Sequence, residues 1–239
     1  MLWIASIILL VVVQLIFTVP YLLYIWATSG PPDMQALVTD KIVAFLSIIA
    51  VAPSHLLTLA LIWLVVREGG KRPFWKTIGF EWPRTFSPAT VVLACSGLAV
   101  TLLLLGGAAT YFWGGNKTQL DLLVESSIPA RLATAFVAVF TAPLVEELIY
   151  RGVLYSAIER TLGTIIAIIV VSLLFAGVHV FQYQNNIAVV AVITLLSITL
   201  TLVRAYTGKV LPSFIIHLVF NGIQSIFIAL SPFIGWSSN

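Results

Sequence analysis

Cysteine and charged side chains are scarce in this sequence of 239 residues, and each scarcity excludes a class of protein. A single cysteine, Cys95, excludes an intramolecular disulfide and a cysteine cluster that binds metal. Asp, Glu, Lys and Arg make up 9% of the residues, whereas about 25% is usual in a soluble domain. Together with a hydrophobic fraction of 60% and a mean hydropathy of +1.09, this low charge excludes an ordinary soluble protein.

Long apolar runs occupy most of the chain instead. A membrane-spanning helix needs about 20 predominantly apolar residues. Seven segments meet or approach this length, at 2–26, 42–66, 88–113, 128–155, 164–182, 187–203 and 210–233. The sequence therefore predicts an all-α fold, a polytopic membrane helical bundle of about seven transmembrane helices. Residues 1–239 are expected to form a single membrane domain without a soluble module.

The cations are distributed unevenly among the connections between these segments. The connection between the second and third segments holds Arg67, Lys71, Arg72, Lys76 and Arg84. Arg204 and Lys209 fall between the sixth and seventh segments. Because cytoplasmic loops carry an excess of Lys and Arg, we expect a cytoplasmic N-terminus and an external C-terminus. The expected location is a prokaryotic cell membrane, with the first segment retained because it lacks the basic start of a signal peptide.

Polar side chains inside the apolar segments give the clearest indication of function. Such side chains are costly in the bilayer, and they persist where they are paired, face a wet cavity or take part in chemistry. They are Glu146, Glu147, Arg151, His55, His179, His217 and Asn221.

Helical geometry predicts different roles for the two glutamates. Adjacent residues of an α-helix point about 100° apart, so we expect that Glu146 and Glu147 do not aim at one small site. Glu147 and Arg151 are four residues apart with the acid first, which favours an ion pair on one face. This pairing would leave Glu146 to face the interior of the bundle.

The same spacing of four places Phe175 with His179, and His217 with Asn221, on single helix faces. Taken singly, the polar residues have structural interpretations: His55 as a packing histidine, and Asn221 as an interhelical hydrogen-bond donor.

Taken together, Glu146, His179, His217 and Asn221 supply general bases and hydrogen-bond donors. The residues alone therefore predict a buried polar site and leave its function unspecified.

Three motifs formed by these residues follow one another along the last part of the chain. They are Glu-Glu-x-x-x-Arg at 146–151, Phe-x-x-x-His at 175–179 and His-x-x-x-Asn at 217–221. In this order, on successive helices, they resemble the CAAX protease and bacteriocin-processing family of intramembrane endopeptidases, which includes the type II CAAX prenyl endopeptidase. The family core would cover 125–239, and the first three segments resemble the family only in hydropathy.

The resemblance implies a helical membrane peptidase that hydrolyses a peptide bond with water. It assigns Glu146 and His179 to the activation of water, and His217 and Asn221 to the stabilisation of the oxyanion. It also implies three supporting residues, which are Glu147, Arg151 and Phe175.

The resemblance leaves two catalytic types open. One is a metal-free glutamate mechanism, and the other uses zinc, for which Glu146, His179 and His217 would be the ligands. The sequence favours the absence of a cofactor, because it lacks His-Glu-x-x-His and because asparagine is an uncommon zinc ligand. Asparagine is, however, a common oxyanion donor.

The expected partners are the lipid bilayer and a peptide or protein substrate, for which prenylation and membrane embedding are both left open, and no nucleic acid. Two alternatives belong to other classes. A non-catalytic scaffold or bacteriocin-immunity protein would have a broken motif, whereas all three motifs are intact. An ion-coupled transporter, with Glu146 and the histidines as a relay, would have inverted repeats or paired broken helices, which the sequence does not show.

Overall fold

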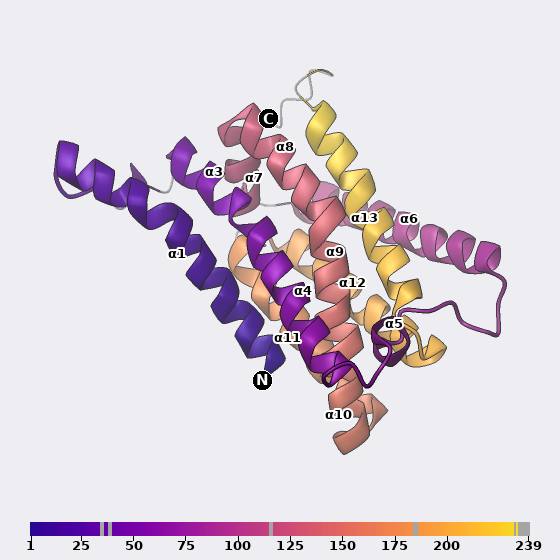
Figure 1. Ribbon diagram of the computed structural model, residues 1–239. Coiled ribbons are helices and arrows are strands. Elements are labelled where there is room, and N and C mark those ends of the chain that lie inside the picture. Colours follow the sequence, from indigo (N-terminus) through magenta and orange to yellow (C-terminus); the bar gives the residue numbers. More distant parts are fainter. Residues whose placement is uncertain (34–35, 38–39, 115–116, 184–185, 232, 234–239) are drawn as a thin grey trace.

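The computed structural model describes residues 1–33, 36–37, 40–114, 117–183, 186–231 and 233. Within these ranges the regular structure is entirely helical, and no strand is present (Figure 1). The predicted all-α class is confirmed.

Long and short helices alternate in the N-terminal half of the chain. The N-terminal half contains α1 (Leu2–Ser29), α3 (Lys41–Ile49), α4 (Val51–Arg67), α5 (Phe74–Ile78), α6 (Pro88–Trp113) and α7 (Gln119–Ser126). One continuous helical segment follows, made of α8 (Ile128–Phe136), η1 (Val137–Thr141), α9 (Ala142–Glu147), η2 (Leu148–Leu154) and α10 (Tyr155–Leu162). The last helices are α11 (Thr164–Tyr183), α12 (Ile187–Thr207) and α13 (Leu211–Leu230). The two η elements are π-helical turns.

In the part of the chain that the structure describes, six helical segments are long and apolar enough to cross a membrane. They are Leu2–Ser29, Lys41–Arg67, Pro88–Trp113, Ile128–Leu162, Ile187–Thr207 and Leu211–Leu230. Each corresponds to a predicted segment, and together they indicate an integral membrane protein. The remaining predicted segment, 164–182, corresponds to α11, whose apolar part, Thr164–Val180, is shorter than each of these six segments.

Short polar residues set the beginnings of several helices. The Asp40 carboxylate accepts hydrogen bonds from two backbone N–H groups in the first turn of α3, at 2.7 and 3.0 Å. Ser87 caps α6 in the same way. Thr118 and Asp121 form a capping box at the start of α7.

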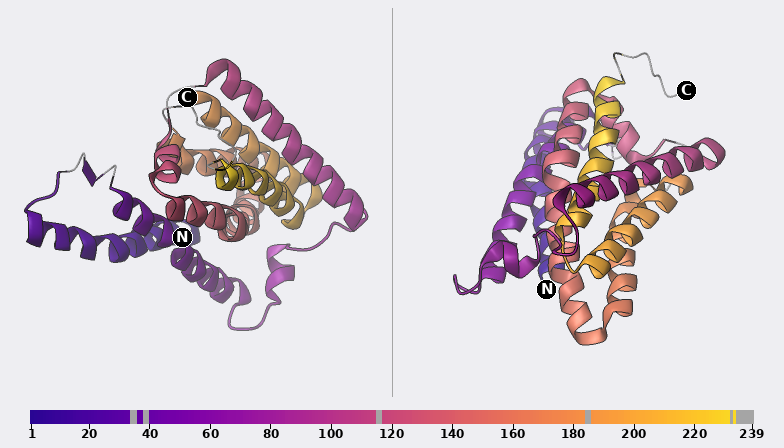
Figure 2. Two further views of the ribbon diagram at one scale, coloured as in Figure 1. Left: turned by 90° about the horizontal axis from the view of Figure 1, so that it is seen from above. Right: turned by 90° about the vertical axis from the view of Figure 1, so that its right-hand side faces the viewer.

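The segment from α8 to α10 runs through the middle of the bundle. In Figure 1, α1 and α4 lie on one side of it, α6 and α13 lie on the other, and α11 and α12 lie behind it. The views in Figure 2 show α6 lying across α12 and α13, in agreement with their packing. The residues of the three motifs therefore come from α9, η2, α11 and α13, which converge inside the bundle.

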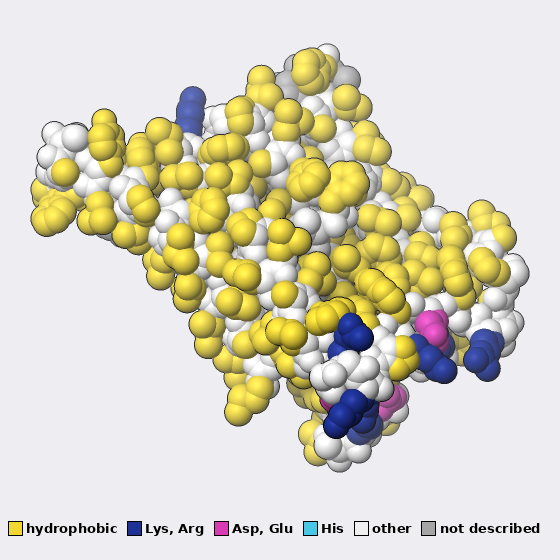
Figure 3. Space-filling view, viewed as in Figure 1, with side chains coloured by type: hydrophobic (Ala, Val, Ile, Leu, Met, Phe, Trp, Pro, Cys, Tyr) yellow, Lys and Arg dark blue, Asp and Glu magenta, His cyan; other side chains and the backbone are white. Residues whose placement is uncertain are grey.

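Most of the charged side chains visible in Figure 3 gather at one end of a largely hydrophobic face. Helix α5, the end of α10 and the start of α13 all lie at this end, which we call the basic end (Figure 1). The N-terminus lies toward the basic end, whereas α13 ends on the opposite side. The structure thus groups the connections that were predicted to share a side of the membrane, and which side they face remains a prediction.

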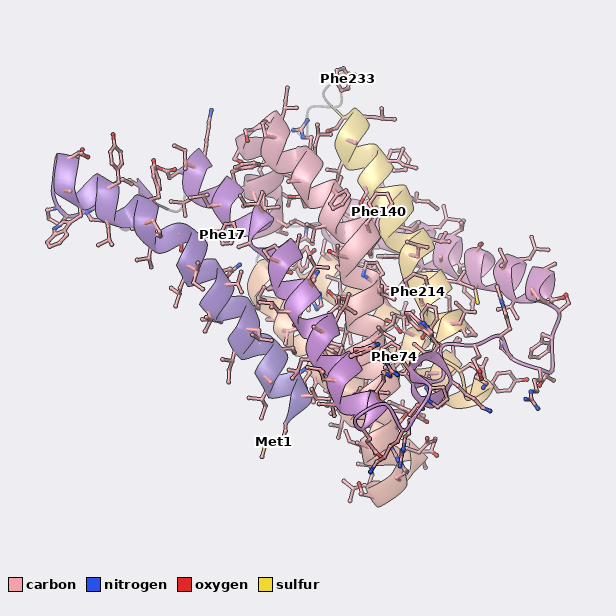
Figure 4. All side chains as sticks on the ribbon, in the orientation of Figure 1. Met1, Phe17, Phe74, Phe140, Phe214 and Phe233 are labelled. Atoms are coloured by element: carbon pink, nitrogen blue, oxygen red, sulfur yellow. The ribbon has the colours of Figure 1, made fainter. Side chains whose placement is uncertain are left out.

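The basic connection between α4 and α6 is attached to the start of α13. Lys209 Nζ donates to Glu81 Oε2 at 2.7 Å, and the ring centroids of Phe80 and Phe214 are 5.2 Å apart. Figure 4 shows Phe74 of α5 and Phe214 of α13 in this region. The helix that carries His217 is therefore anchored at its first turn to a connection from the N-terminal half.

Candidate active site

Glu147 and Arg151 form a fully buried ion pair in the middle of the bundle. Arg151 Nη1 donates to Glu147 Oε1 at 3.0 Å, and neither side chain has exposed surface. Arg151 Nη2 donates to the Ser197 carbonyl at 3.0 Å and lies 3.2 and 3.3 Å from the hydroxyls of Ser197 and Thr201 on α12. A buried charge needs an opposite charge and further hydrogen bonds, and this guanidinium has both. The predicted neutralised pair is confirmed.

His217 lies between the two glutamates. Its Nδ1 is 3.0 Å from Glu147 Oε1, and its Nε2 is 3.7 Å from Glu146 Oε2. The expectation that the adjacent glutamates do not aim at one site is therefore wrong. The physical reason is that the imidazole has nitrogens on two edges, so two long side chains that leave the helix in different directions can converge on it.

The two glutamates differ in their access to water. Because Glu147 is the ionised partner of Arg151, His217 donates its Nδ1–H to Glu147, and Nε2 faces Glu146. The Glu146 side chain is 22% exposed, whereas that of His217 is 3% exposed and that of Glu147 is fully buried. Glu146 is therefore the carboxylate of this cluster that a water molecule or a substrate can reach.

His179 joins the cluster through Phe175. The two rings have centroids 4.7 Å apart, and the centroid of the His217 ring lies 5.8 Å from that of the same phenylalanine ring, in an edge-to-face arrangement. His179 Nδ1–H donates to the Phe175 carbonyl at 2.8 Å, and a carbonyl can only accept. In the neutral form of the ring, this bond leaves the lone pair on Nε2 of His179. The Arg151 guanidinium stacks on Phe175 at 4.5 Å, so this ring supports both histidines and the arginine.

Asn221 is bonded to the helical segment that carries the glutamates. Its Nδ2 donates to the Ala138 carbonyl at 3.0 Å. Hydrogen bonds in η1 join residues five apart, as between Ala142 N–H and Val137 O, so Ala138 O would next receive a bond from Pro143. Proline has no N–H, and Asn221 supplies the missing donor. The Asn221 amide keeps a second N–H beyond this bond.

A π-helical turn lies on each side of Glu146 and Glu147, and both turns are held by a side chain from another helix. Arg204 Nε donates to the Arg151 carbonyl in η2 at 3.0 Å, and its Nη2 donates to Ser156 Oγ at 3.0 Å. The placement of Arg204 in the connection before the last segment is wrong, because Arg204 belongs to α12 and is 8% exposed. Such turns occur often at functional sites, and the periodicity of the sequence does not predict them.

His55 reaches the same segment from α4. Its Nδ1 lies 2.8 Å from Thr141 Oγ1, at the end of η1. This is an interhelical hydrogen bond, which agrees with the interpretation of His55 as a packing histidine. The ring also lies within electrostatic range of Glu146.

The arrangement of donors does not fit a zinc ion. In the part of the chain that the structure describes, no three His, Cys, Asp or Glu side chains are placed to hold one metal ion. The three predicted zinc ligands, Glu146, His179 and His217, therefore do not form such a group. Zinc requires ligand atoms at about 2.0–2.3 Å from the ion, and His217 already donates Nδ1–H to Glu147.

Comparison with protein families matches residues 128–223 to the family described as type II CAAX prenyl endopeptidase Rce1-like. Comparison with curated proteins and with solved structures gives no match. The matched segment begins at the start of α8, ends within α13 and contains all three motifs. Residues 128–223 are therefore a domain of the Rce1-like type II CAAX prenyl endopeptidase family, which implies an intramembrane endopeptidase that acts on protein or peptide substrates.

Proposed function

We propose that Glu146 is the base of this endopeptidase and activates the water that attacks the peptide carbonyl. The proposal rests on the difference in burial and ion pairing between the two glutamates around His217. Glu147 is buried and neutralised by Arg151, whereas Glu146 is partly exposed. Among the described residues, no Lys or Arg lies within ion-pair distance of Glu146. A reachable carboxylate without such a partner is suited to take up a proton.

Peptide hydrolysis needs a base for the water and a proton for the leaving amine. Glu146 takes a proton from the water as the water oxygen bonds to the carbonyl carbon. The same proton passes to the amine nitrogen when the carbon–nitrogen bond breaks. His179 assists by accepting a hydrogen bond from the water at Nε2, the atom that its bond to the Phe175 carbonyl leaves with a lone pair.

His217 and Asn221 stabilise the negative charge that develops on the carbonyl oxygen. They lie one turn apart on α13, and Asn221 has a second N–H besides the one bound to Ala138 O. His217 donates from Nε2 in its doubly protonated form. In that form the charges of Glu146, Glu147, Arg151 and His217 cancel, which suits a site with low dielectric constant.

We assign the reaction to these side chains without a metal step, because the donors do not fit zinc. Purified protein treated with a strong chelator should keep most of its activity. Complete loss of activity on chelation, restored by stoichiometric zinc, would overturn this assignment and make Glu146, His179 and His217 ligands.

The function itself is tested by comparing cells that produce the wild-type protein with cells that produce Glu146→Gln. We expect new peptide termini in the membrane proteome or in released peptides of the wild type only. Glu68→Gln, which changes an exposed glutamate at the basic end, is the matched control and should behave like the wild type. Identical termini in all three strains, at equal protein levels, would contradict peptidase activity.

A further inference from the structure

An apolar hollow opens at the basic end of the molecule. It has a volume of about 220 Å³ and lies between the start of α6, the end of α12 and the start of α13. Its lining includes Pro83, Phe86, Ala94, Cys95, Tyr206 and Pro212. None of its lining residues belongs to the glutamate cluster. Pockets for complete small ligands have about 300–1,000 Å³, so this hollow suits a segment of an apolar chain.

Cations surround a single carboxylate beside this hollow. Lys76, Arg84 and Lys209 all act electrostatically on Glu81, and Lys209 bonds to it at 2.7 Å. Three cations and one carboxylate leave a local charge of +2. Arg84 stands between the lining residues Pro83 and Phe86 in the sequence, which places this charge at the edge of the hollow.

We propose that the hollow binds an anionic phospholipid of the bilayer, with part of an acyl chain inside it and the phosphate at Arg84 and its neighbouring cations. The apolar lining favours an acyl chain, and the local positive charge favours an anionic head group over a zwitterionic one. Trp82 is 43% exposed in the same connection, which is typical of a side chain at the head-group level. This proposal does not depend on the peptidase activity.

Two substitutions separate the contributions of the acyl chain and of the head-group charge to lipid binding. Ala94→Phe places a ring in the hollow from an exposed position of α6, so it does not enter the buried core. Arg84→Gln removes a cation at the edge of the hollow. Arg72→Gln is the matched control, because Arg72 lies in the same connection but pairs with Glu68 at 3.1 Å.

The test measures phosphatidylglycerol and phosphatidylcholine retained by the purified protein in native mass spectrometry. Cys95, the only cysteine, lines the hollow and supplies a second measurement, its rate of alkylation by N-ethylmaleimide. The wild type and Arg72→Gln should retain phosphatidylglycerol preferentially and show slower alkylation in its presence. Ala94→Phe should lose the retained lipid, and Arg84→Gln should bind it about fivefold more weakly.

Equal retention of the two lipids, or undiminished retention by both Ala94→Phe and Arg84→Gln, would overturn the proposal. An uncharged isoprenoid alcohol that protects Cys95 better than phosphatidylglycerol would also overturn it, because the chain and not the charge would then select the ligand. Arg84→Gln alters only a surface charge, so it decides the matter if Ala94→Phe does not fold. If Cys95 does not react with N-ethylmaleimide, the amount of lipid retained in mass spectrometry decides between these outcomes.

Discussion

Replacement of Gly152 by alanine should destabilise the protein, although alanine is the better helix former. Gly152 follows Arg151 in η2 and packs against Ile78 of α5. A Cβ atom at this position would lie 2.5 Å from Ile78 Cγ1 and 3.0 Å from Ile78 Cδ1. Ile78 is 3% exposed, so its side chain has little room to move away.

Two opposing terms set the expected magnitude. Forcing an extra methyl group into a packed site costs about 1–3 kcal/mol. Replacing glycine by alanine within a helix returns about 0.5–1 kcal/mol. The net destabilisation by Gly152→Ala should therefore lie between about 0 and 2.5 kcal/mol, with a central value of about 1 kcal/mol. In an Ile78→Ala background both clashing atoms are absent, and Gly152→Ala should become neutral or slightly stabilising.

The assay is the free energy of unfolding in detergent, followed by sodium dodecyl sulfate titration, for the wild type, both single variants and the double variant. Residues in contact should show a coupling energy above about 0.5 kcal/mol. The reasoning is refuted if Gly152→Ala has the same effect with and without the Ile78 side chain, because the close approach of α5 to η2 would then have no energetic consequence.

Three further predictions concern separate parts of the molecule. Asn221→Ala should lower the turnover number per folded molecule by about 10²–10³ with little change in KM, because it removes an oxyanion donor. If Asn221→Ala instead lowers only the amount of folded protein and leaves the activity per folded molecule unchanged, the bond of Asn221 to η1 is its only role. The hydrogen bond from Lys209 lowers the pKa of Glu81 below 4.5, so the attachment of the basic connection to α13 should be intact at neutral pH and weaken as the pH falls below about 4.5. Limited proteolysis of that connection against pH should show this acid sensitivity, and Glu81→Gln should be pH-independent over the same range. In a Cys95→Ser background, a cysteine introduced by Gly70→Cys should be protected from an impermeant reagent outside the cell, and external labelling would reverse the predicted topology.

Local features of the site could be predicted from the sequence. The Glu147–Arg151 pair depends on a spacing of four within one helix, which a sequence displays directly. The placement of His217 and Asn221 on one face of α13 follows from the same rule. The three motifs also lie inside the segment that matches the family.

Features that depend on packing between helices could not be predicted. His217 contacts both glutamates because α13 crosses the segment at their level, and no spacing rule gives that crossing. Asn221 reaches Ala138 because a π-helical turn and a proline together leave one carbonyl without a donor. The sequence predicts that Arg204 lies in a connection, because a cation at the end of an apolar run usually marks the membrane surface. In the structure it is buried against the Arg151 carbonyl instead.

Glu146 is the proposed base, and Glu147 is proposed to support the structure. The most direct test of this difference is the cleavage rate of purified Glu146→Gln and Glu147→Gln, normalised to the amount of folded protein. Glu146→Gln keeps shape and should melt like the wild type while losing about 10²–10⁴ in rate, the usual contribution of a general base. Glu147→Gln should lose about 3–5 kcal/mol of stability, because it leaves the Arg151 charge buried without a partner. A folded and inactive Glu147→Gln beside an active Glu146→Gln would contradict the account.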